Sequence, residues 1–333
     1  MGTFLDHRRV PFSFYSPYNS SMRACLGFFG LCLCSFAQQF FDVTGRIDPP
    51  LQASVSLHAT ASAFATSALS DTAGSFHFSH IEPGIYTLVV FLPGRGESRS
   101  SIDVGPGTAD DKARVGIVAH INESSLTPDP YAGKVSVREL SIPQKAVDES
   151  RAADKSLTSN DTASAVKHLE KAVRLAPGFS AAWNHLGTIA YKSGNYERAE
   201  KCFRKSLFAD PQSFEPLVNL GGVLLNLKKL DEAWSYNVQA VQRRPNDALA
   251  NVQLGMTYFE MGKADLALRH LNAARHLDPG HFSLPQLMVV EIYLRRKQNS
   301  EAADVLDEFL RYHPDWPAAP KMRETIVALR SSR

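Results

Sequence analysis

Hydrophobic and polar positions alternate in the first part of the chain, between about residues 41 and 121. In segment 53–58, Ala, Val and Leu are separated by Ser, Ser and His. A period of two places the apolar side chains on one face of a half-buried strand. Turn signals at 71–74 and 82–84 separate such runs, and strand-forming residues follow at 75–78 and 85–91. Short strands between Gly- and Pro-containing turns predict a sandwich or barrel.

A different period begins after residue 142. Prolines recur at intervals of 34 residues and once of 35, at Pro177, Pro211, Pro245, Pro279 and Pro314. Leucine–glycine pairs keep the same register at 186–187, 220–221 and 254–255. We expect the extra residue of the last interval in the short turn before Ala302. A 34-residue period of this kind predicts stacked helical hairpins, each ended by a proline.

One repeat reads Trp183-x-x-Leu186-Gly187-x-x-x-Tyr191, followed by Gly194, Tyr196, Ala199, Phe203 and Pro211. This pattern resembles the tetratricopeptide (TPR) hairpin. The resemblance implies about five TPR repeats over 142–317, stacked into an all-α superhelix. Met322, Thr325, Ile326 and Leu329 follow helical spacing, which predicts a capping helix over 318–333.

The first domain also carries a family pattern. Val43–Ile47, then Asp71-x-x-Gly74-x-Phe76-x-Phe78, then Pro83-Gly84-x-Tyr86-x-Leu88 resembles the carboxypeptidase regulatory-like domain. That resemblance implies a transthyretin-like or immunoglobulin-like sandwich of about seven strands over 38–121, and it implies no peptidase activity. Ser, Pro and Gly in 122–141 indicate a linker. The predicted fold class is therefore a multidomain chain: a small all-β sandwich followed by an all-α TPR superhelix.

The N-terminal 37 residues have the three parts of a secretory signal. Arg23 precedes an apolar stretch at 25–34, and Ser35-Phe36-Ala37 supplies small residues for cleavage. We expect the start at Met22, cleavage after Ala37 and a mature chain beginning at Gln38. The apolar stretch is shorter than the ~20 residues that a transmembrane helix needs. An exported protein of the bacterial periplasm or cell surface is therefore expected, with a lipid anchor at Cys32 or Cys34 as the less favoured variant.

Composition and motifs argue against catalysis and nucleic-acid binding. Formal net charge is +2, without the concentrated basic face that nucleic acid requires. Downstream of the signal only Cys202 remains, and we expect it to be a small apolar core residue on a helix. His120-x-x-Glu123 has a zinc-ligand spacing, but it ends a predicted strand without a surrounding catalytic domain. No P-loop, nucleophile elbow or dinucleotide fingerprint is present, so no enzyme activity, cofactor or metal is expected.

The TPR resemblance implies a concave groove lined by the first helix of each hairpin, which receives a peptide or helix of another protein. Two rows follow the repeat register: Tyr191, Leu225, Phe259 and Tyr293, and then Asn184, Val218, Val252 and Gln286. Other candidates lie nearby: Thr188, Lys192, Asn226 and Met256. Aromatic residues and Met suit partner surfaces. Packing between adjacent helices is the alternative for every apolar member, and it is favoured for Leu225 and Val252.

The predicted function is a non-catalytic protein-interaction scaffold of the cell envelope. The alternative is a surface- or glycan-binding protein that uses the sandwich, with the repeats as a spacer. Short basic runs at 228–229, 243–244 and 295–297 coincide with expected helix ends. We interpret these as solvated charges at helix ends.

Overall fold

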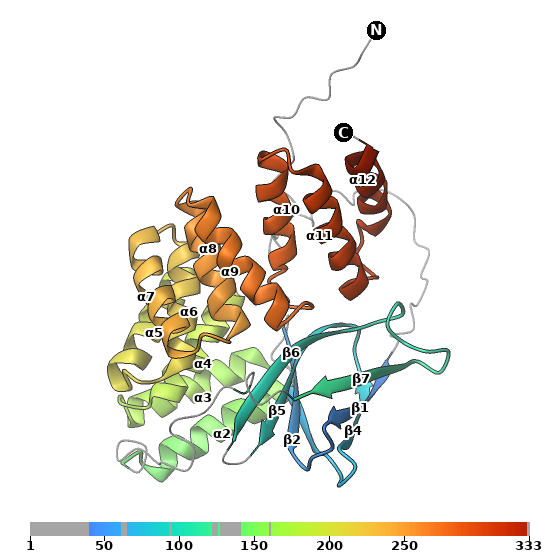
Figure 1. Cartoon of the computed structure of the whole chain (residues 1–333). Helices are drawn as coiled ribbons and strands as arrows, with labels where there is room; N and C mark the ends of the chain where they lie inside the picture. The colour runs from blue at the N-terminus through green and yellow to red at the C-terminus, as the bar shows by residue number, and fades with distance from the viewer. Residues whose placement is uncertain are drawn as a thin grey trace, which may run out of the picture. The chain divides into compact units, whose positions relative to one another are not determined.

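A computed structural model describes residues 40–60, 65–92, 95–121, 126, 141–159 and 161–331. The predicted export signal, most of the 122–141 linker and Glu123 lie outside these residues. Residues 39–333 form one compact unit, in which a β-sandwich precedes a run of helices (Figure 1). The predicted fold class is confirmed.

The sandwich is built from two sheets. Within the described residues the strands are β1 (Phe41–Asp48), β2 (Ser54–Ala59), β3 (Ala65–Leu69), β4 (Ser75–Ile81), β5 (Gly84–Leu92), β6 (Gly96–Val104) and β7 (Arg114–His120). One sheet has the order β4-β1-β7, with β1 and β7 parallel, and the other has the order β3-β2-β5-β6. Strand β6 is therefore the edge strand of the larger sheet.

Alternating side chains fill the space between the two sheets. Val43 and Phe76 from one sheet meet Leu57 and Leu88 from the other in a shared buried core. The period-two pattern of the sequence thus identified the inner face of β2 correctly. Tyr86 also points inward, and its hydroxyl donates to the carbonyl of Glu82 at 2.7 Å, so the one polar atom of this buried ring has a partner.

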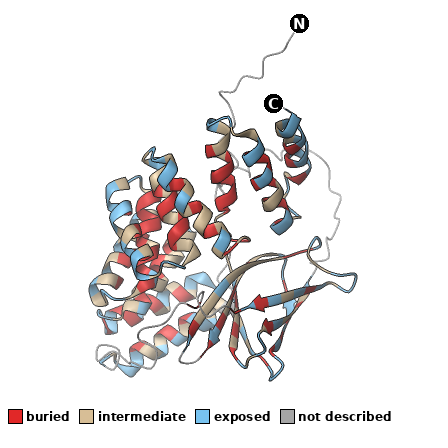
Figure 2. Ribbon diagram, in the orientation of Figure 1, coloured by how far each residue is buried: buried red, intermediate tan, exposed pale blue. Residues whose placement is uncertain are grey.

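The helices form five hairpins and a terminal helix. They are α2 (Gln144–Thr158), α3 (Thr162–Leu175), α4 (Ser180–Lys192), α5 (Tyr196–Ala209), α6 (Phe214–Asn226), α7 (Leu230–Arg243), α8 (Ala248–Glu260), α9 (Ala264–Leu277), α10 (Pro285–Arg295), α11 (Asn299–Tyr312) and α12 (Ala319–Ser331). Red buried residues follow the middle of the helix stack in Figure 2. Met322 and Ile326 of α12 are buried and α12 packs on α11, so this helix covers the end of the stack.

Glycines at the repeat positions allow the two helices of each hairpin to approach closely. A Cβ added to Gly187 would lie 2.5 Å from the ring of Phe203, sixteen residues later. The same spacing joins Gly255 to Leu271, where the distance would be 2.7 Å. No larger residue fits at either glycine without displacing a buried side chain.

The middle hairpin departs from this pattern with a buried amide. Asn237 takes the place of Phe203 and Leu271 and is 0% exposed. Its Nδ2 donates to Thr257 Oγ1 at 2.9 Å, while its Oδ1 is buried without a hydrogen-bond partner. An unpaired buried acceptor is destabilising because it has lost its water.

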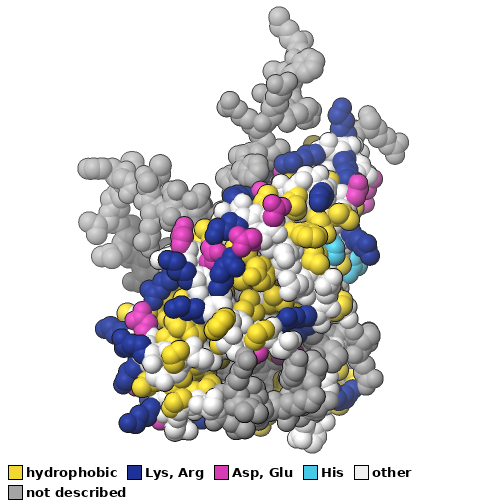
Figure 3. Space-filling view, turned by 90° about the vertical axis from the view of Figure 1, so that its left-hand side faces the viewer, with side chains coloured by type: hydrophobic (Ala, Val, Ile, Leu, Met, Phe, Trp, Pro, Cys, Tyr) yellow, Lys and Arg dark blue, Asp and Glu magenta, His cyan; other side chains and the backbone are white. Residues whose placement is uncertain are grey.

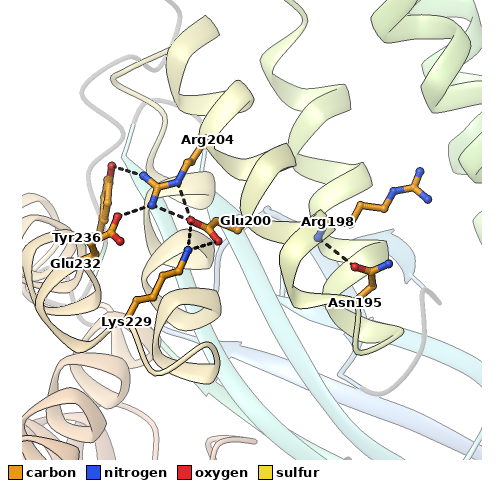
Figure 4. A network of polar contacts seen from close by, with 7 residues as sticks. All are labelled: Asn195, Arg198, Glu200, Arg204, Lys229, Glu232 and Tyr236. Carbon is orange, nitrogen blue, oxygen red and sulfur yellow. Dashed lines mark hydrogen bonds and ion pairs between the residues drawn. The ribbon is translucent and has the colours of Figure 1, made fainter.

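Ion pairs connect successive hairpins along the second helices. Arg204 of α5 binds Glu232 of α7 at 2.5 Å, and Lys229 reaches back to Glu200 at 2.8 Å (Figure 4). Burial acts to raise the pKa of Glu200, but hydrogen bonds from Lys229 and Arg204 hold it below its usual value. Arg204, Lys229 and Glu232 are each more than a third exposed, although Glu200 is not, so each pair contributes little and buried packing supplies most of the stability.

The predicted position of the extra residue is wrong. The first helix of each of the last four hairpins ends at a C-terminal capping residue. These residues are Ser193, Leu227, Met261 and Arg296, at intervals of 34, 34 and 35 residues. Because α10 is already a continuous helix from Pro285, the insertion precedes it, in the α9–α10 connection. That connection ends at Leu284 with φ 51°, a left-handed conformation absent from the corresponding ends of the three preceding connections.

We predict that Gly187→Val lowers the free energy of unfolding by about 1–3 kcal/mol, because the branched side chain overlaps the buried ring of Phe203. Thermal unfolding followed by circular dichroism measures the change. Gly178→Ala is the matched control, since nothing lies within 4 Å of a Cβ there. Equal melting temperatures for the two variants would contradict the close-packing argument.

We predict that Asn237→Leu stabilises the chain by about 1 kcal/mol, since it removes an unpaired buried oxygen and restores the residue type of the next hairpin. Thr257 keeps its own bond to the Gln253 carbonyl at 2.7 Å, so no new unpaired group is created. The reciprocal change, Leu271→Asn, should destabilise. Chemical denaturation of both variants measures the pair, and a loss of stability in Asn237→Leu would refute the prediction.

Candidate protein-binding face of the repeat array

The first helices of successive hairpins, α4, α6, α8 and α10, carry the predicted binding residues. Contacts join α4 to α6 and α6 to α8, so α4, α6 and α8 form one continuous layer. We call the side chains that this layer presents away from the second helices the A-helix face.

A row of polar pairs crosses this face between hairpins. Asn219 Nδ2 donates to Asn184 Oδ1 at 3.1 Å, and Asn226 Nδ2 donates to the Tyr191 hydroxyl at 3.1 Å. Both pairs are 35 residues apart, one more than the repeat. Sequence reasoning therefore missed Asn219 and chose its neighbour Val218. The signal that could have found it is an asparagine 35 residues after Asn184.

Three of the predicted apolar residues are buried. Val218 packs in a cluster with Phe214 and Ala250, and Leu225 packs against Ala190 and Val223. Val252 is fully buried. The packing alternative therefore describes these side chains, which present no surface to a partner.

The remaining predicted residues are half-buried or exposed. The guanidinium of Arg295 lies 4.9 Å from the centre of the Phe259 ring, a cation–π arrangement at the edge of the face. Met256 packs against the Leu225 cluster, and the Thr188 hydroxyl donates to the Asn184 carbonyl within its own helix. Among these half-buried or exposed residues, Tyr191 and Asn226 can form hydrogen bonds with a partner, and Phe259 can provide an aromatic contact.

Tyr293 does not extend the row of Tyr191, Leu225 and Phe259. Each of those residues lies two positions before the capping residue of its helix, and in α10 that position is Leu294. The insertion before α10 moves Tyr293 and Gln286 one position out of register. Gln286 is buried, and its amide donates to the Pro279 carbonyl.

Comparison with known proteins finds similarity to TPR proteins in the helical region. A family model for the middle TPR-like domain of cilia and flagella-associated protein 70 matches residues 151–278. The human cell division cycle protein 16 homolog is 28% identical over 167 residues, which cover 47% of this chain and 27% of the relative. The Arabidopsis thaliana TPR repeat-containing thioredoxin TTL4 is 28% identical over 109 residues, 33% of this chain and 16% of the relative. The chain thus spans about a quarter or less of these relatives.

Solved structures of TPR proteins resemble the helical region. MamA from Desulfovibrio magneticus RS-1 is 21% identical with a TM-score of 0.48, covering 53% of this chain and 99% of MamA. YrrB, described as a TPR protein with an unusual peptide-binding site, is 24% identical with a TM-score of 0.45, covering 57% of this chain and 98% of YrrB. The run of helical hairpins and the family-model match over 151–278 together show a TPR-like superhelix in the helical region of this chain.

Lys192, the last of the predicted residues, ends α4. It is half-buried, and burial lowers its pKa.

The structure describes two further residues that the sequence singles out, His120 and Cys202. Among the described residues there is no group of three or more His, Cys, Asp or Glu side chains placed to hold a metal ion. His120 pairs with Asp48 at 2.9 Å, and Glu123 lies outside the described residues. Cys202 is buried on α5 and burial raises its pKa, as expected for a packed thiol.

The surface charge of the TPR array is mixed. Figure 3 shows Lys and Arg side chains lying among Asp and Glu side chains on one face. The basic runs 228–229 and 295–297 pair with acids, for example Lys228 with Glu260 at 2.9 Å and Arg296 with Asp265 at 2.8 Å. No described helix is both long and apolar enough to span a bilayer.

Proposed function

We propose that this chain is a protein-interaction scaffold that receives a peptide or helix of another protein on its A-helix face. The observation that carries the proposal is the row of amide and hydroxyl pairs across adjacent hairpins. Asn184 with Asn219, and Tyr191 with Asn226, set side-chain donors and acceptors side by side on the neighbouring helices α4 and α6. Groups of this kind can exchange their mutual bonds for bonds to a peptide backbone.

The edge of the same face offers an apolar contact. Phe259 supplies an aromatic ring, and the Arg295 guanidinium, which is paired with Glu291 of the same helix, lies over it. Aromatic and arginine residues contribute disproportionately to the stability of protein interfaces. A partner that combines an exposed backbone with one aromatic side chain fits this arrangement.

We further propose that the scaffold acts in the bacterial envelope. Arg23, the apolar stretch 25–34 and the small residues before Gln38 support export to the periplasm or cell surface. The seven-strand sandwich supports membership of the carboxypeptidase regulatory-like group for the first domain. Cell fractionation and N-terminal sequencing test the location: a mature chain beginning at Gln38 is expected, and an intact N-terminus in the cytosol would contradict export.

We predict that replacing Tyr191 and Phe259 together with alanine reduces partner capture from an envelope fraction at least tenfold. Each interface aromatic is expected to contribute about 1 kcal/mol or more to the binding free energy, and about 1.4 kcal/mol corresponds to a factor of ten in affinity. Quantitative mass spectrometry of the captured proteins is the measurement. Phe208→Ala is the matched control, since Phe208 on α5 is 88% exposed and lies on a second helix. Equal capture by the double variant and the control would refute the A-helix face as the binding surface.

A further inference from the structure

Strand β6 lies along the connections between hairpins of the TPR array. The strand lies at one edge of its sheet, because among the described strands it pairs only with β5. Four of its residues that meet the array are spaced by two, so they share one side of the strand: Glu97, Arg99, Ser101 and Asp103.

Asp278 anchors the middle of β6. Its carboxylate is 5% exposed and accepts the Ser101 backbone N–H at 2.9 and 3.0 Å and the Ser101 hydroxyl at 2.7 Å. A Cβ added to Gly280 would lie 2.9 Å from the Ser101 carbonyl oxygen, so the connection touches the strand backbone. A buried carboxylate with three charge-assisted contacts is a built recognition site for the edge of a strand.

Equivalent positions of three hairpins contact β6 in order. Arg244, Asp278 and His313 each stand immediately before the proline that ends a repeat. Arg244 pairs with Glu97 at 3.8 Å, and His313 lies 3.9 Å from Asp103. Arg244 is therefore half-buried in this contact, and the expectation of a solvated charge at 243–244 is wrong for this residue.

The array is modified at the place where the anchor lies. The α9–α10 connection holds the inserted residue and the left-handed Leu284, and it also holds Asp278 and Gly280. Asp315 in the next connection accepts the Gly107 N–H at 2.7 Å, which extends the contact beyond the end of β6. The irregularity of the repeat thus coincides with the strand-binding site.

We propose that the inter-repeat edge of the TPR array is a strand-binding surface occupied by the chain's own β6, and that Asp278 is the anchor that holds the strand there. The docking does not depend on the proposed function.

Amide hydrogen exchange of the full chain tests the docking without any partner, because the Ser101 N–H donates to Asp278. Asp278→Ala removes the anchor, and Gly280→Val fills the space against the Ser101 carbonyl. Each variant should raise the exchange rate of the Ser101 amide about tenfold relative to the Lys201 amide of α5, the factor expected when a hydrogen bond to a charged group is lost. Two independent variants keep the test valid if one of them folds poorly.

The repeat supplies matched controls for both changes. Asp210→Ala and Gly178→Val alter equivalent positions of regular hairpins, with nothing within 4 Å of a Cβ at Gly178. Neither control should change the exchange rate of the Ser101 amide. An unchanged Ser101 rate in both test variants would overturn the proposal, as would a rise shared equally by the Lys201 amide, which reports loss of the array fold. Failure of partner capture would leave this result untouched.

Discussion

The close approach of two helices at a glycine is the constraint on which the helical region depends. Phe203 and Leu271 occupy the space that a side chain at Gly187 or Gly255 would need. Each hairpin is therefore a closely packed pair of helices, but alone it cannot bury its apolar surface. Stacking against the next hairpin completes the core, which is why the 34-residue period has to be kept so strictly.

The one place where the period fails is therefore informative. An inserted residue between α9 and α10 shifts the register of α10 and produces a longer connection that ends in a left-handed Leu284. Asp278 in this connection faces the sandwich and holds Ser101. Regular stacking builds the A-helix face, and a local departure from it creates the site that holds the first domain against the array.

Periodicity made most of the fold predictable. The strand alternation identified the core side of β2, and the recurring prolines located five hairpins and a terminal helix. The site was only partly predictable. Val218, Leu225 and Val252 follow the repeat register but are buried, whereas Asn219 meets Asn184 at an offset of 35 because neighbouring helices are staggered. The Ser101–Asp278 contact joins residues 177 positions apart and has no periodic signature.

A double-mutant cycle between Ser101 and Asp278 tests most directly whether β6 lies on the α9–α10 connection in solution. The Ser101 hydroxyl donates to the Asp278 carboxylate at 2.7 Å, so chemical denaturation of Ser101→Ala, Asp278→Ala and the double variant should give a coupling free energy of about 1–2 kcal/mol. The same cycle between Ser101→Ala and Asp210→Ala should give a coupling free energy near zero. Equal or absent coupling in the two cycles would contradict the docked arrangement.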